Sequence, residues 1–299
     1  MALRPHALLP RQYDHQKVLA TTVDAWGRAL WLICPDADLR PTSYGRQSAR
    51  PRTIPYDALL VVSHGGVLHE HLLRDMNLRV THLDALPNGR FVLHGHGPAG
   101  DQNAQIYSMD GRRRHGFAMG DAVEYLMADR RHHIWSAYSD EGVYSHPISA
   151  AGLVRWDSGG RHEWGYKPPA GTEYIDTVYA LNVDDDVAWA SYYPTFPLLE
   201  ARTGGEIRLR KSPVVAPRGM AVHGEQIVML GGCRQPDRLH HCRTTAHEAL
   251  PVEEARLTLP NGSPLKRYIR PVGRGRHLYL RDTTPRQWYV TGIEDLTSL

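Results

Sequence analysis

A repeated pair of apolar segments is the feature that most limits what this chain can fold into. Six times, an apolar run, a tight polar turn and a second apolar run recur in the same order. The repeats are spaced 61, 43, 54, 39 and 51 residues apart when the equivalent positions are taken as Trp31, Val92, Trp135, Trp189, Val228 and Tyr279. A four-stranded propeller blade needs about 40 to 50 residues. The repeat therefore predicts an all-β protein, a six-bladed β-propeller.

A second hairpin lies between these pairs, clearest at 104–119, 152–166 and 198–209. Each has a glycine at its turn, and glycine supplies the positive φ that tight hairpin turns need. Each repeat therefore reads as four antiparallel strands, A to D. We predict a single domain over 1–299 with blades at about 15–75, 79–120, 122–167, 174–211, 216–260 and 265–299.

The last repeat is one strand short, because 286–292 can form its third strand and little chain follows. Residues 3–13 precede the first blade and are otherwise unused. Pairing this segment with the last blade would close the ring and cover two sheet edges. A pair of β-sandwiches is the competing architecture.

Packing between blades explains most of the large aromatic residues. One four-stranded sheet cannot cover both of its faces, so neighbouring blades must pack on each other. Aromatic residues at repeat-equivalent positions are typical of that core. We assign to it Trp31, Trp135, Trp156, Trp164 and Trp189.

Charge and composition narrow the partners. The chain has 35 Lys and Arg against 32 Asp and Glu, so its net charge is only +3, and basic and aromatic residues do not alternate. Nucleic acid is therefore an unfavoured partner. No apolar run approaches the roughly 18 residues of a membrane-spanning helix. With three cysteines and no apolar leader, the expected location is the cytoplasm, and the oligomeric state stays open.

The segment GLVRWD, followed by a glycine turn and RHEW, occupies 152–164. This pattern resembles blades of the NHL-type, gluconolactonase and strictosidine-synthase-like propellers, and more distantly those of virginiamycin-inactivating lyases. The segments YSDEGVY (138–144) and YALNV (179–183) are similar to parts of uncharacterised bacterial propellers. The resemblance covers nearly the whole chain as architecture and implies no activity, since no catalytic motif matches residue by residue.

Loop lengths indicate which face carries a site. The A–B turns are short, whereas the B–C loops are long and polar. We therefore predict a recognition module that binds a small polar ligand or a peptide on the B–C loop face. The candidate ligand-binding residues are Asp101, Asp140, Glu141, Asp176, Tyr192, Tyr193, Arg234 and Arg281.

A metal-assisted hydrolase or lyase acting on a lactone or ester is the alternative function. Gluconolactonase-like propellers hold a metal near the axis, and Ca²⁺ prefers carboxylate and carbonyl oxygens. The candidate ligands are Glu124, Asp140, Glu141 and Asp176. The catalytic candidates are Asp140 and Glu141 with His94 or His96 as base. Alternatively, Asp140 and Glu141 form a solvated turn that binds no metal. We therefore expect no cofactor, and if a cation is bound, Ca²⁺ is the expected one.

Two further features remain as weaker hypotheses. Zn²⁺ is a less favoured metal, on the cluster of Cys233, His240, His241, Cys242 and His247, whose spacing is poor. A basic patch on the A–B turn face is the other, built from Arg28, Arg90, Arg112, Arg113, Arg114, Arg130, Arg131, Arg274 and Arg276 and interrupted by Asp184, Asp185 and Asp186.

A scaffold that docks partners on the blade rims is a third candidate function, and it predicts a large apolar patch on the outer surface.

Overall fold

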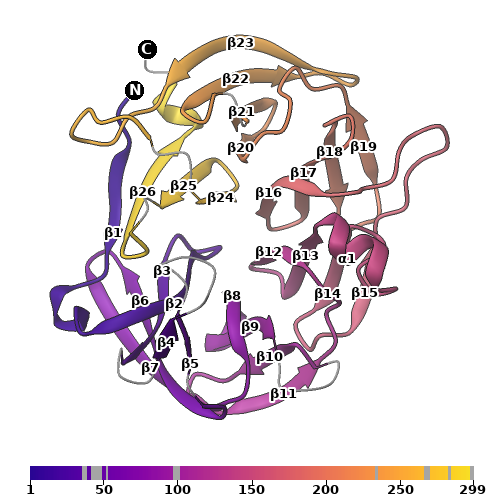
Figure 1. Cartoon of the computed structure of the whole chain (residues 1–299). Coiled ribbons are helices and arrows are strands. Elements are labelled where there is room, and N and C mark those ends of the chain that lie inside the picture. The colour runs from indigo at the N-terminus through magenta and orange to yellow at the C-terminus, as the bar shows by residue number, and fades with distance from the viewer. Residues whose placement is uncertain are drawn as a thin grey trace.

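The computed structural model describes residues 1–35, 39–41, 49–51, 53–96, 102–232, 235–265, 270–281 and 284–296. Its sheets stand around a common axis, with the N- and C-terminal segments side by side (Figure 1). Within the described ranges, no helix is long and apolar enough to cross a membrane. The predicted all-β class and the four-stranded antiparallel sheets are confirmed.

Each of sheets 1 to 5 contains four strands that pair in the order in which they follow along the chain. Sheet 1 contains β2 (Gln16–Val23), β3 (Ala29–Pro35), β6 (Tyr56–His64) and β7 (Val67–Met76), and sheet 2 contains β8 (Arg79–Leu86), β9 (Arg90–His96), β10 (Ala104–Tyr107) and β11 (Arg113–Phe117). Sheet 3 contains β12 (Val123–Ala128), β13 (His133–Tyr138), β14 (Leu153–Asp157) and β15 (His162–Gly165). Sheet 4 contains β16 (Val178–Asp184), β17 (Val187–Tyr192), β18 (Leu198–Arg202) and β19 (Ile207–Arg210), and sheet 5 contains β20 (Gly219–His223), β21 (Gln226–Leu230), β22 (Arg238–Thr244) and β23 (Ala249–Arg256).

The last sheet combines the two ends of the chain. It contains β24 (Arg270–Arg274), β25 (His277–Arg281) and β26 (Gln287–Gly292), and β1 (Arg4–Leu8) pairs antiparallel with β26. The predicted pairing of the N-terminal segment with the last repeat is therefore present. A single parallel pair, Asn182 with Gly273, also joins β24 to β16 of sheet 4.

The core consists of apolar clusters between neighbouring sheets. Trp135 packs with residues of sheets 3 and 4, whereas Trp156 packs with residues of sheets 2 and 3. Another cluster joins the first sheet to the last through Trp31, Tyr279 and Trp288. The assignment of Trp31, Trp135, Trp156 and Trp189 to buried packing is confirmed, and the half-buried Trp164 ring lies 6.0 Å from the Trp135 ring.

Several strand-ending aspartates fix the tight turns on one face. In each case the carboxylate accepts the backbone N–H groups two and four residues later and also contacts a basic side chain four residues later. An aspartate that satisfies turn N–H groups in this way favours the turn over extended chain. The pattern Asp-x-x-x-Arg/His occurs as Asp24 with Arg28, Asp129 with His133, and Asp157 with Arg161.

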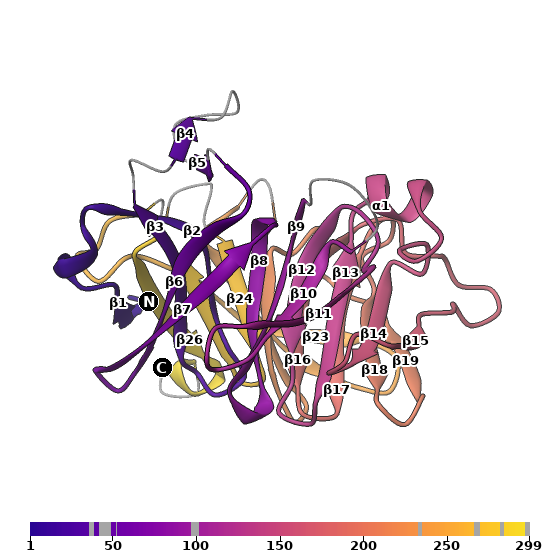
Figure 2. The same ribbon diagram turned by 90° about the horizontal axis from the view of Figure 1, so that it is seen from below.

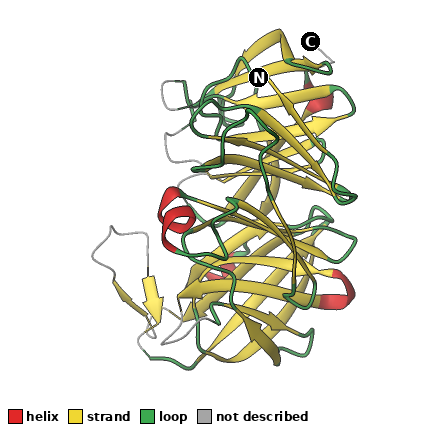
Figure 3. Cartoon of the chain, turned by 90° about the vertical axis from the view of Figure 1, so that its right-hand side faces the viewer, coloured by secondary structure: helices red, strands yellow, loops and turns green. Residues whose placement is uncertain are grey.

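The other face carries the long connections. The small pair β4 (Leu39–Pro41) and β5 (Ala49–Pro51) and the helix α1 (Asp140–Ser145) both stand on it (Figure 2). The same placement is visible from the side in Figure 3. This face corresponds to the B–C loop face of the sequence, and it holds the residues discussed next.

Candidate functional site

The B–C loop of sheet 3 folds into the short helix α1, directly after β13. Asp140 and Glu141 occupy its first turn, where negative charge is favourable. Gly142 is buried, and a Cβ at this position would lie 2.2 Å from the carbonyl oxygen of Asp121. Only glycine fits this close approach, so α1 is held tightly against the preceding connection.

Hydrogen bonds join α1 to the loop before β16, and this loop to the residue that follows β17. The Tyr144 hydroxyl donates to Asp176 Oδ2 at 2.9 Å, and the Asp140 N–H donates to Thr177 Oγ1 at 3.0 Å. Thr177 Oγ1 in turn donates to Asp176 Oδ1 at 2.9 Å, and the Tyr193 N–H donates to the Thr177 carbonyl at 2.9 Å. We call Asp140, Tyr144, Asp176, Thr177 and Tyr193 the rim cluster. The hydrogen bond from Tyr144 to Asp176 raises the pKa of the Tyr144 hydroxyl.

The rim cluster brings together three of the predicted ligand-binding residues, Asp140, Asp176 and Tyr193. Glu141 is exposed beside them on α1. Tyr192 instead points into the core, where its hydroxyl lies 2.9 Å from that of Tyr166. Arg281 is half-buried at the end of β25 in the last sheet, and Asp101 and Arg234 lie outside the described residues.

The predicted calcium ligands do not converge. Both oxygens of Asp176 accept side-chain hydrogen bonds, and Asp140 Oδ1 accepts the N–H of Glu141. Across the described part of the chain, no group of three or more His, Cys, Asp or Glu side chains is placed to hold a metal ion. The described carboxylates therefore do not fit a calcium centre of 6 to 8 oxygen ligands.

Glu124 lies at a β-bulge that was not predicted from the sequence. The innermost strands of sheets 1 to 4 each shift register near their start on the loop face, between Val18 and Ala20, Val80 and His82, Val123 and Tyr125, and Val178 and Ala180. A β-bulge re-aims its extra residue and is often found beside functional sites. The bulged residues are Leu19, Thr81, Glu124 and Tyr179, and only the recurring valine before each one hints at them in the sequence.

The histidines proposed as bases differ in environment. His94 is 5% exposed, and its Nε2 has no hydrogen-bond partner among the residues that the structure describes. Its Nδ1 lies 3.4 Å from Thr81 Oγ1, and the His82 ring is 5.8 Å away. Burial, followed by the neighbouring His82 and His96, lowers the pKa of His94 well below 6.5. His96, two residues later in β9, is exposed.

This burial makes the stability of the protein depend on pH. Because the folded state keeps His94 neutral while the unfolded state binds a proton below about pH 6.5, stability is expected to fall on acidification. The slope contributed by one such group approaches about 1.4 kcal/mol per pH unit. His94→Gln should make the fall between pH 7 and pH 5 shallower, measured by urea unfolding. His96→Gln is the matched control and should follow the wild type; equal slopes in all three proteins would contradict the assignment.

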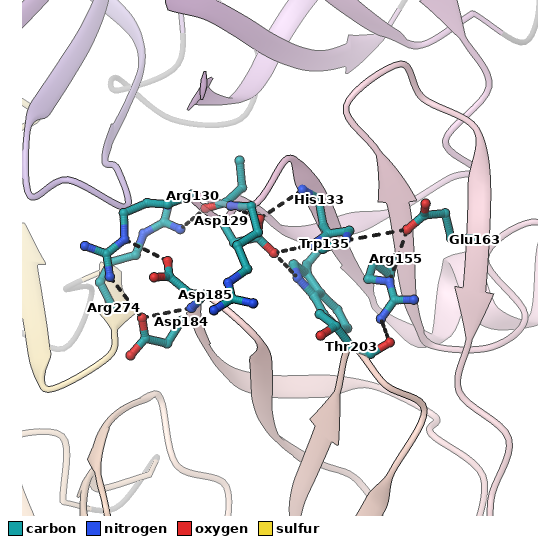
Figure 4. Close-up of polar contacts among 12 residues, drawn as sticks. Asp129, Arg130, His133, Trp135, Arg155, Glu163, Asp184, Asp185, Thr203 and Arg274 are labelled. Carbon is teal, nitrogen blue, oxygen red and sulfur yellow. Dashed lines mark hydrogen bonds and ion pairs between the residues drawn. The ribbon is translucent and has the colours of Figure 1, made fainter. Parts of the chain in front are cut away.

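Ion pairs neutralise part of the predicted basic patch. Among its nine arginines, those paired with a described carboxylate are Arg28, Arg112, Arg114, Arg130 and Arg274. Arg130 contacts Asp185 at 2.7 Å and Asp184 at 3.7 Å, and Arg155 contacts Glu163 at 3.3 Å. Figure 4 shows these pairs beside Asp129, which lies between His133 and Trp135. Arg28 pairs with Asp24, and Arg112 and Arg114 both contact Asp110. These ion pairs reduce the positive charge that the patch offers to a polyanion.

Arg274 lies at the axis, where four sheets meet. Its Nε donates to the Val23 carbonyl at 2.9 Å and its NH1 group donates to the Ala128 carbonyl at 2.8 Å. Its NH2 group forms an ion pair with the fully buried Asp84. Arg274 therefore connects the last sheet to sheets 1, 2 and 3, and its guanidinium group is used in contacts within the protein.

The predicted zinc cluster is separated by the strand geometry. His240 and His241 contact Glu254 and Glu253 on the neighbouring strand β23, at 3.0 and 3.2 Å. Cys242 is buried, which raises the pKa of its thiol to about 11, and Cys233 lies outside the described residues.

A cavity of about 610 Å³ lies against sheet 1, away from the rim cluster, and its lining includes Gln16, Tyr56, Asp57 and Leu72.

Known proteins resemble this chain in fold only. No family model matches it, and no curated protein matches its sequence. A virginiamycin B lyase from Staphylococcus aureus superposes with a TM-score of 0.51 at 12% identity, covering 96% of this chain and 98% of the lyase. A streptogramin B lyase gives 0.51 at 12% identity, covering 93% of each chain. Hsv2 from Kluyveromyces lactis gives 0.55 at 9% identity, covering 93% of this chain and 73% of Hsv2. The predicted resemblance to virginiamycin-inactivating lyases therefore holds for the propeller-like architecture.

Proposed function

We propose that this protein is a six-bladed β-propeller and a recognition module that binds a small polar ligand or a peptide on its B–C loop face. The rim cluster carries the proposal. Hydrogen bonds join three connections of two neighbouring sheets at this place, and three of the residues involved, Asp140, Asp176 and Tyr193, were also predicted from the sequence.

The chemistry of the rim cluster suits binding. Tyrosine offers a large amphipathic contact surface at low conformational cost, and carboxylates supply polar orientation. Tyr144 is 76% exposed and Tyr193 is 46% exposed, so both side chains are open to solvent. Hydrogen bonds to Asp176 and Thr177 fix the loops before any ligand arrives, and such preorganisation lowers the entropic cost of binding.

The six-bladed arrangement is supported by the strand groups and by the apolar clusters that join successive sheets. The cluster of Trp31, Tyr279 and Trp288 supports the contact between the first and last blades. Loops on one face of a propeller then surround the axis, so neighbouring B–C loops can contact one ligand together.

A double substitution tests the location of the site. Ligand-observed NMR against mixtures of small polar metabolites and short peptides should identify binders of the intact protein. We expect Tyr144→Ser with Tyr193→Ser to weaken those binders at least about tenfold, because each buried tyrosine contact contributes about 1 kcal/mol or more.

Val67→Ser with Leu250→Ser is the matched control, since it removes two exposed apolar side chains from the outer strands β7 and β23. This control should bind as the wild type does. Binders that are retained by the tyrosine variant but lost in the control would place the site elsewhere and contradict the proposal.

A further inference from the structure

Exposed tyrosines are concentrated around the rim cluster. Tyr144 and Tyr174 are each 76% exposed, more than any other large apolar side chain among the described residues, and Tyr193 is 46% exposed. They lie on α1, on the loop between β15 and β16, and directly after β17. The loop between β15 and β16 extends outward from the rim in Figures 1 and 2.

The aromatic rings are held in place by packing as well as by hydrogen bonds. The Tyr193 ring lies 5.9 Å from Phe196 in an edge arrangement, and Phe196 in turn packs against Tyr179 at 5.1 Å. Tyr174 lies two residues before Asp176, whose N–H donates to the Tyr193 carbonyl at 3.3 Å. Tyr144 and Tyr193 therefore belong to hydrogen-bonded loops of sheets 3 and 4, and the exposed Tyr174 lies on one of these loops.

The charges of this surface are one-sided. Asp140, Glu141, Glu173 and Asp176 lie in the segments 139–149 and 166–177, where Lys167 is the one lysine or arginine and His146 the one histidine. In the described part of the chain, none of these four carboxylates forms an ion pair with a basic side chain, whereas Asp184, Asp185 and Asp186 on the opposite face all do. The surface therefore presents exposed tyrosine side chains together with carboxylates that form no ion pair with the basic side chains of the described residues.

We propose that this surface, consisting of the rim cluster with Tyr174, Glu141 and Glu173, binds a positively charged, extended peptide segment. The inference rests on the proposed function and names the class of its ligand. Arginine and lysine side chains stack on aromatic rings through cation–π attraction, and unpaired carboxylates bind the same groups. Complementary charge also selects against acidic and neutral segments.

An extended segment fits better than a compact cationic ligand because the tyrosines come from three separate connections. A bound cation is favoured beside the carboxylates of this surface, among them Asp140 and Asp176. Recognition of this kind depends on ionic strength, since exposed charges are screened within about 3 Å at about 1 M salt.

A displayed library of random short peptides, panned on the intact protein, provides the test. We expect the enriched peptides to be rich in lysine and arginine. A fluorescein-labelled copy of the most enriched peptide should bind in anisotropy titrations and should bind at least about tenfold more weakly at about 1 M salt. The same peptide with glutamate in place of each lysine and arginine should not bind.

Matched charge variants locate the interaction. Asp140→Asn with Asp176→Asn should weaken binding of the enriched peptide about tenfold or more, because it removes two carboxylates while the side chains keep their size. Glu225→Gln with Glu248→Gln removes the same charge from exposed positions in sheet 5 and should leave binding unchanged. Circular dichroism of each variant checks that the fold is retained.

The possible failures are distinguishable. Enriched peptides without net positive charge that still lose affinity in the Tyr144→Ser and Tyr193→Ser variant would overturn the cationic inference and leave the proposed function standing. Peptides that are unaffected by both the tyrosine and the carboxylate variants would overturn both proposals. A library that yields no binder would overturn the cationic inference, and the proposed function would then be decided by the NMR screen with small polar metabolites.

Discussion

Substitution of Arg274 by methionine is expected to lower the free energy of unfolding by about 3 to 5 kcal/mol. The guanidinium is the buried partner of Asp84, and its loss leaves a buried carboxylate without a counter-ion. Two carbonyl groups, those of Val23 and Ala128, lose a donor at the same time. Urea unfolding at pH 7 measures the effect.

The pH dependence of this variant follows from Asp84. Burial raises the pKa of Asp84 to about 6, and Arg274 opposes this shift. A carboxyl whose pKa is raised in the folded state stabilises the fold at low pH and loses that contribution as pH rises through the folded value. Without Arg274 the raised pKa moves further upward, so Arg274→Met should be less damaging near pH 5 than near pH 7.

Two comparisons make the Arg274 result specific. Arg274→Met combined with Asp84→Leu should recover much of the lost stability, because the unpaired charge is removed as well. Arg130→Met breaks the exposed pairs with Asp184 and Asp185 and should cost at most about 1 kcal/mol. Equal losses for Arg274→Met and Arg130→Met would contradict the role given to the buried pair.

Truncation of Leu9 is the second large effect. Leu9 is 1% exposed and packs with Trp31 and Trp288 at the junction of the first and last sheets. We expect Leu9→Ala to lower the free energy of unfolding by about 2 to 4 kcal/mol, because it leaves a cavity in a well-packed core. Thermal and urea unfolding measure this loss.

The neighbouring residue provides the control. Leu8 is 57% exposed at the end of β1, so Leu8→Ala should change stability by less than about 0.5 kcal/mol. Deletion of residues 1–9 should be more damaging than Leu9→Ala because it also exposes the edge of β26, and an added peptide of the same sequence should restore part of the loss by strand addition. Full stability of the deleted protein would show that β1 does not support the last sheet.

The sequence predicted the repeated strands well because their signal is local. Alternating apolar residues and glycine turns depend on neighbours in the chain, and the hairpins at 104–119, 152–166 and 198–209 correspond to strand pairs β10–β11, β14–β15 and β18–β19. The pairing of β1 with β26 could also be predicted from the sequence, because the last repeat lacked a strand and the segment 3–13 had no other partner.

The site was harder to predict because it depends on distances between separate loops. The neighbouring tyrosines Tyr192 and Tyr193 look equivalent in sequence, yet the first is buried in β17 and the second is exposed just after the strand. The helix α1 had the signals of a helix start, with Ser139 before two acids, but they were read as a polar loop. The contact of Tyr144 with Asp176 spans 32 residues and has no local signature.

The pairing of β1 with β26 has a consequence for the order of events during synthesis. β1 precedes every other described strand and is bonded to the third strand of the last sheet, with Arg4 opposite Val290. Sheets 1 to 5 are complete in sequence by Arg256, but β26, the strand paired with β1, begins only at Gln287. While the chain between β1 and β26 is being synthesised, the edge of β1 that binds β26 is unsatisfied, and the contact between the first and last sheets forms only afterwards.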